Sequence, residues 1–112
     1  MKYLYHYTSS QGLRGILNDG VIWSSDDTRD AVYGKGVYLT SLPPTTDIWD
    51  LLENNWDGSP QFYLTKLDNL DYCIEFRKKD LPRVRKTADS RDVWKVPHDI
   101  DLGVVQFRVW KR

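Results

Sequence analysis

Three short segments of this chain carry residue types that suit a charged sugar derivative. His6 lies near the N-terminus, Tyr38 closely follows Gly34-Lys35-Gly36, and Asp92 lies in the C-terminal half. A neutral imidazole can hydrogen-bond a ligand hydroxyl, and glycines allow a tight turn and a close backbone approach. The Tyr38 ring can stack on a flat group, and Asp92 offers a carboxylate. Together, an imidazole, a ring and an anion suit a flat, cationic leaving group on a sugar, of which the nicotinamide of NAD is an example.

The residues around His6 predict a strand that passes directly into a helix. Residues 2–7 are aromatic and β-prone, which is typical of a strand. Thr8 and Gln11 have the spacing of a capping box, so we expect the helix to be capped by Thr8. Leu13, Ile16 and Leu17 share one face of that helix, and Gly20 suits its left-handed end. His6 is thus expected to face a cleft.

The central segment predicts a second strand and a second helix. We expect a short strand at 21–23, a polar loop at 26–35 and a strand at 36–42 that stops at two prolines. Thr46 is expected to cap a helix broken from Asn54 to Pro60. Its apolar positions are Ile48, Trp49, Leu51 and Leu52.

The C-terminal half shows alternating patterns that favour strands. Apolar and polar residues alternate around Ile74 and again around Phe107, and 92–96 reads as a strand ended by Pro97. Early helices and late strands predict an α+β domain over residues 1–112.

Composition limits the classes of function. The 112 residues include 40% apolar and 29% charged residues, which is an ordinary globular balance. Sixteen basic residues oppose sixteen acidic ones, so no overall field favours nucleic acid or an anionic membrane. Cys73 is the single cysteine, so no intrachain disulfide can form, and no His and acid spacing suggests a metal. The N-terminus resembles neither a signal peptide nor a membrane span, so we expect a cytoplasmic protein, with delivery to another cell left open.

The three segments also resemble a known family. The sequences His-Tyr-Thr-Ser at 6–9 and Gly-Lys-Gly-Val-Tyr-Leu-Thr at 34–40 are similar to ADP-ribosyltransferases of the His-Tyr-acid group, which includes diphtheria toxin and the poly(ADP-ribose) polymerases. The similarity is greatest to the toxin-type HYD1 subgroup, whose third residue is Asp. It implies split antiparallel sheets around an NAD cleft, with NAD as the substrate and no required metal.

The resemblance implies roles for individual residues. His6 would bind a ribose, while the Tyr7 backbone and Thr8 would adjoin the nicotinamide amide. Tyr38, reached through Gly36, would stack on nicotinamide. Trp49, eleven residues later, would be a second stacking ring. Asp92 would stabilise the positive charge of the ribose as nicotinamide leaves. Other acids stay open for this role: Glu75, Asp89, Asp99 and Asp101.

Several alternatives accompany this reading. ADP-ribose could pass to an unknown protein or nucleic acid, or to water, which would make the chain an NAD glycohydrolase. A non-catalytic NAD or ADP-ribose binding module is a further alternative. The basic residues from Arg77 to Arg91 could bind a pyrophosphate or a nucleic acid, although such a run is more often a solvated connection. Taken singly, His6, Tyr38, Trp49 and Asp92 would each be ordinary structural residues.

Overall fold

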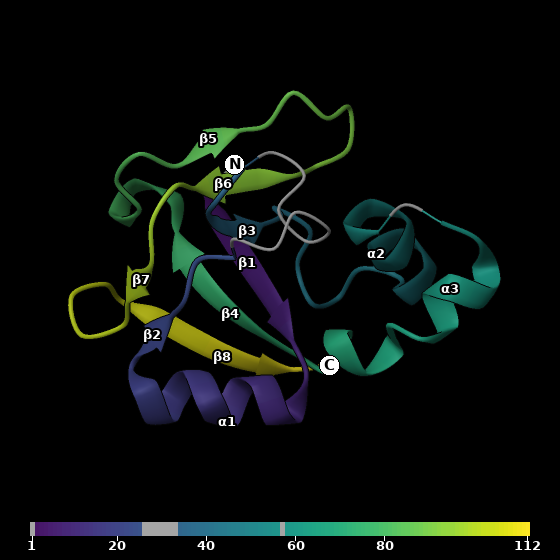
Figure 1. The fold of residues 1–112 in the computed structure, drawn as a ribbon, viewed down its shortest axis with the longest axis horizontal. Coiled ribbons are helices and arrows are strands. Elements are labelled where there is room, and N and C mark those ends of the chain that lie inside the picture. Colours follow the sequence, from purple (N-terminus) through teal and green to yellow (C-terminus); the bar gives the residue numbers. More distant parts are fainter. Residues whose placement is uncertain (1, 26–33, 57) are drawn as a thin grey trace.

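The strands form three small antiparallel sheets that are joined by short helices. The computed structural model describes residues 2–25, 34–56 and 58–112, so the predicted loop at 26–35 lies largely outside the described residues. The elements in chain order are β1 (Tyr3–Thr8), α1 (Ser10–Asp19), β2 (Val21–Ile22), β3 (Val37–Leu39), α2 (Ile48–Asn55), α3 (Pro60–Leu64), η1 (Leu67–Leu70), β4 (Tyr72–Arg77), η2 (Lys78–Asp80), β5 (Arg85–Lys86), β6 (Trp94–Val96), β7 (Ile100–Asp101) and β8 (Phe107–Lys111). The sheet orders are β1-β4-β8, β2-β7 and β3-β6-β5 (Figure 1). This arrangement confirms the predicted α+β class.

The first helix begins one residue later than predicted. Ser9, not Thr8, is the N-cap, and its hydroxyl accepts a hydrogen bond from the Gly12 N–H at 3.0 Å. Thr8 is still paired with Tyr72 as the last residue of β1, so the chain leaves the strand and enters the helix one residue later, at Ser9. Gly20 ends the helix with φ of 69°, in the left-handed region that was predicted for it.

The second helix also departs from the prediction at both ends. Asp47, not Thr46, caps it by accepting from the Trp49 N–H at 2.9 Å. Its last residue is Asn55, so the expected break at Asn54 is wrong by two residues. A further helix, α3, then begins at Pro60, in agreement with the preference of proline for a first helical turn.

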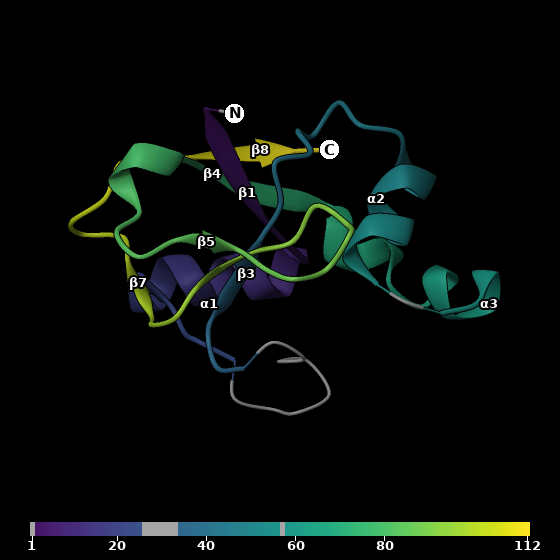
Figure 2. The same cartoon turned by 90° about the horizontal axis from the view of Figure 1, so that it is seen from above.

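Two apolar clusters hold these elements together. The larger one lies between α1 and the sheets, and its fully buried members include Leu4, Ile74 and Val96. The smaller one anchors α2 through Leu51 and Leu52, which are both 0% exposed. Figures 1 and 2 show α2 and α3 together on the side of the molecule away from β7. Tyr7 packs against this smaller cluster, which therefore fixes α2 relative to β1, the strand that also carries His6.

Candidate functional site

Four of the predicted residues meet at a gap between two sheets: His6, Tyr7, Tyr38 and Asp92. The N–H and C=O groups of Tyr5 bond those of Thr40, at 2.8 and 3.0 Å, and this bridge joins β1 to the segment after β3. Beyond it the two strands no longer pair. A pocket of about 250 Å³ opens there. The residues that line it are Tyr5, His6, Tyr7, Tyr38, Leu39, Thr40, Asn55, Trp56, Arg91, Asp92 and Val93.

The His6 side chain bridges the two strands at this opening. Its Nδ1 lies 2.9 Å from the carbonyl oxygen of Tyr38. A carbonyl can only accept, so Nδ1 carries the proton and the Nε2 of the neutral ring is an acceptor. Burial lowers the pKa of His6 below 6.5, and the bond to Tyr38 partly opposes this effect. The ring is therefore neutral at pH 7 and presents a lone pair.

The backbone of Tyr7 faces the same opening. In an antiparallel strand, the N–H and C=O groups of residues two apart point to the same side. Because those of Tyr5 point toward Thr40, those of Tyr7 also point away from β4 and toward the gap. The Tyr7 hydroxyl donates to the carbonyl of Leu42 at 2.7 Å, so its side chain is occupied by packing.

The Asp92 carboxylate is held from two sides. Its Oδ1 accepts from the Ser41 N–H at 2.9 Å and from the Trp94 indole at 3.0 Å, while its Oδ2 accepts from the Ser41 hydroxyl. A carboxylate has about four acceptor positions, so roughly one remains, on Oδ2. These bonds fix the orientation of the charge and leave one oxygen able to accept from a ligand.

A family comparison agrees with this arrangement. A protein-family model described as a HYD1 signature containing ADP-ribosyltransferase matches residues 4–104. The chain belongs to this ADP-ribosyltransferase family. Neither a curated protein nor a solved structure matched the chain.

Among the five acids that the sequence left open, Asp92 is the one that lines the pocket. Asp89 forms an ion pair at 2.6 Å with an arginine two residues on. Asp99 and Asp101 accept hydrogen bonds from backbone amides, at 2.7 and 2.8 Å. Glu75 accepts from a tryptophan of β8 at 3.2 Å. Asp92 lines the pocket, and these other acids do not.

Three other predicted residues do not line the pocket. Trp49 is 45% exposed on the first turn of α2. Trp56 follows the last residue of this helix, about 10 Å farther along the helix axis, and lines the pocket instead. Thr8 packs against α1, where a Cβ added at Gly12 would overlap with its Oγ1. Gly36 lies against the neighbouring strand, because a Cβ there would be 2.6 Å from the Val96 carbonyl oxygen. This glycine permits contact between strands.

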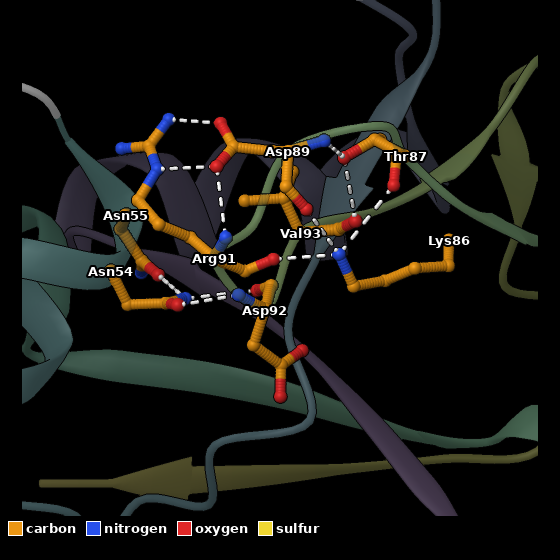
Figure 3. Close-up of polar contacts among 8 residues, drawn as sticks. All are labelled: Asn54, Asn55, Lys86, Thr87, Asp89, Arg91, Asp92 and Val93. Carbon is orange, nitrogen blue, oxygen red and sulfur yellow. Dashed lines mark hydrogen bonds and ion pairs between the residues drawn. The ribbon is translucent and has the colours of Figure 1, made fainter.

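Two residues of the basic stretch from Arg77 to Arg91 make contacts within the fold. The Lys86 ammonium donates to the carbonyls of Asp89 and Arg91, each at 2.7 Å, and orders the loop between β5 and β6 (Figure 3). Arg91 lines the pocket while bonding Asp89 through Nε and Nη2, at 3.0 and 2.6 Å. The part of this stretch from Lys86 to Arg91 is thus a structured connection.

Sequence reasoning missed several residues around the acid. Ser41 and Trp94 bind the carboxylate, and Trp56 contributes a pocket wall. Trp94 lies two residues after Asp92 in an extended segment, so its place on the same face could have been inferred. Ser41 and Trp56 are brought there only by tertiary packing.

Two negative findings apply to the described residues. No helix among them is long and apolar enough to cross a membrane. Within the same ranges, no cluster of three or more His, Cys, Asp or Glu side chains is arranged to hold a metal ion.

Proposed function

We propose that this domain cleaves the nicotinamide–ribose bond of NAD and transfers ADP-ribose to an acceptor. The main support is the meeting of His6, Tyr38 and Asp92 at one pocket of about 250 Å³. Sites that enclose a whole drug-sized ligand measure about 300–1,000 Å³. The pocket therefore suits the nicotinamide–ribose end of NAD, with the adenylate outside it.

In this proposal, aromatic rings and backbone groups hold the nicotinamide. Tyr38 and Trp56 line the pocket and supply ring faces, so Trp56 takes the second stacking role that the spacing suggested for Trp49. The Tyr38 hydroxyl donates to the Gly34 carbonyl at 2.5 Å, which fixes the ring. The Tyr7 N–H and C=O complement the oxygen and NH₂ of the nicotinamide carboxamide.

His6 would hold the ribose by accepting a hydrogen bond. Its Nδ1–H is used on the Tyr38 carbonyl, so Nε2 can accept the proton of a ribose hydroxyl. In this role the imidazole accepts a hydrogen bond from the ribose hydroxyl and does not donate one to it. It requires the neutral ring, which burial favours.

Asp92 would act on the bond that breaks. The electron pair of the C–N bond leaves with nicotinamide, which becomes neutral, and positive charge develops on the ribose. The fixed carboxylate of Asp92 stabilises that charge, and the remaining acceptor position on Oδ2 orients the ribose or the incoming nucleophile. The nucleophile then forms the new bond to the ribose and releases its proton to solvent.

The acceptor decides between transferase and glycohydrolase. The sequence lacks Gln-x-Glu or Glu-x-Glu near Asp92, the pattern of relatives that modify arginine, so we do not propose arginine. A macromolecular acceptor, protein or nucleic acid, is the first proposal, and water is the second.

One incubation separates these activities. NAD labelled on the adenylate is incubated with the domain, alone and with a cell lysate, and nicotinamide release is followed. We expect nicotinamide release together with label on protein or nucleic acid. Label in free ADP-ribose alone means a glycohydrolase. Binding of NAD without nicotinamide release means a binding module and refutes the proposed chemistry.

A further inference from the structure

Asn54 makes an unusual set of contacts with the main chain of Asp92. Its Oδ1 accepts from the Asp92 N–H at 2.8 Å, and its Nδ2 donates to the Asp92 carbonyl at 2.9 Å. Figure 3 shows the two side-chain atoms directed at the same backbone residue. The Asn54 amide therefore bonds Asp92 in the way that a residue of a neighbouring antiparallel strand would.

The same amide reaches two other parts of the pocket wall. Its Nδ2 also lies 3.1 Å from the Thr40 hydroxyl and 3.0 Å from the Asn55 side-chain oxygen. Thr40 follows β3, and Asn55 ends α2 immediately before Trp56. One side chain thus joins the end of α2, the end of β3 and the segment before β6.

This location makes Asn54 a connection between two parts of the pocket wall. Asp92 and Thr40 belong to the sheet side, while Asn55 ends α2 and Trp56 follows it directly. The Ser41 and Trp94 bonds fix the Asp92 carboxylate relative to the sheet. The Asn54 bonds fix the Asp92 backbone relative to α2, which none of those carboxylate bonds does.

We infer that Asn54 is a positioning residue that sets the place of the Asp92 carboxylate relative to a ring held beside Trp56. The inference rests on the proposed function, because it assigns the acid and the stacking wall to one reaction. Asn54 itself does not line the pocket and touches no reacting atom. Its loss therefore affects turnover more than NAD affinity.

Two variants test this role by separating shape from hydrogen bonding. Asn54→Ala removes all of the bonds, whereas Asn54→Asp keeps the size and the acceptor for the Asp92 N–H. The second variant places an oxygen against the Asp92 carbonyl in place of a donor. A misplacement of about 1 Å can reduce a rate about a hundredfold. We expect kcat for nicotinamide release to fall by about that factor in both variants, with KM for NAD changed less than about threefold.

A second readout does not depend on activity. The Asp92 amide proton is bonded to Asn54, so amide hydrogen exchange at Asp92 should accelerate in Asn54→Ala. Exchange at Ile74, inside the β1-β4-β8 sheet, should stay at its wild-type rate. Asn69→Ala and Asn69→Asp provide matched controls, because Asn69 is exposed and outside the pocket. Both should match the wild type in kcat and exchange.

The results distinguish the two levels of inference. Wild-type protein that releases no nicotinamide overturns the proposed function and this role together. An active wild type with unchanged kcat in Asn54→Asp overturns the positioning role and leaves the proposed function standing. A rise in KM at constant kcat also overturns it, since that result assigns Asn54 to NAD binding. If Asn54→Ala fails to fold, the isosteric Asp variant still gives a decisive rate.

Discussion

The bond between His6 and Tyr38 allows the two imidazole nitrogens to be tested separately. In His6→Asn, the side-chain NH₂ group lies near the former position of Nδ1 and can still donate to the Tyr38 carbonyl. The Nε2 acceptor is lost. A net hydrogen bond is worth about 0.5–1.5 kcal/mol, so KM for NAD should rise about two- to thirteenfold. The melting temperature should change little.

The pH dependence provides a second measurement of the same residue. Burial lowers the pKa of His6 from 6.5, so between that value and the lower folded pKa the unfolded chain binds more protons. The stability that neutral His6 contributes is present above about pH 6.5 and is lost as the pH falls through the folded pKa. Thermal unfolding from pH 7.5 to 4.5 should show a decline in wild type that is smaller in His6→Asn.

Steady-state kinetics and thermal unfolding decide the assignment together. A wild-type KM in His6→Asn would falsify the acceptor role of Nε2. A large fall in melting temperature with normal KM would make His6 structural. His6→Gln is the complementary variant, since its longer amide can reach the Nε2 position but leaves the Tyr38 carbonyl without its bond. It should keep more NAD affinity and lose more stability than His6→Asn.

Three further predictions concern the acid, the second ring and the thiol. Asp92→Asn can place its NH₂ toward the Ser41 hydroxyl and keep the fold, but it loses the negative charge, so kcat should fall about 10²–10³-fold. The control Asp101→Asn should stay within about threefold of the wild-type kcat, and equal rates in the two variants would remove Asp92 from the mechanism. Trp56→Phe should keep NAD affinity better than Trp56→Ala, and Trp49→Ala should change it little; a greater loss from Trp49→Ala would restore the spacing-based assignment. Burial raises the pKa of Cys73 to about 12, so a thiol reagent at pH 8 should label it only after unfolding, and rapid native labelling would contradict its burial.

The local sequence predicted the elements well where one interaction dominates. The aromatic strand at the N-terminus, the end of α1 at Gly20 and the strand around Ile74 follow from β-propensity, left-handed geometry and alternation. Helix starts were less certain, because adjacent hydroxyl residues compete for the cap. Ser9 takes it since the pairing of Thr8 with β4 continues one residue farther than its sequence indicates.

The pocket depended on information that no local pattern contains. Residue type, order and the family resemblance suggested His6, Tyr38 and Asp92, and the structure places these three side chains at one pocket. The choice between Trp49 and Trp56 required the position of α2, which is set by two buried leucines in the smaller cluster. Ser41 and Asn54 contact Asp92, which lies 51 and 38 residues away from them in the chain. Such contacts appear only after the sheets have assembled.

The Lys86 ammonium has a consequence for the conditions under which the acid stays in place. It lies among three carbonyl oxygens of the loop that leads to Asp92, at 2.7, 2.7 and 3.5 Å. Carbonyl oxygens collect around calcium in loops of another kind, where order depends on the supply of the ion. Here the positive charge is covalently attached to the chain, so a chelator cannot remove it and dilution cannot dissociate it. The cation that orders this loop is therefore made together with the chain, in a fixed ratio of one to each domain.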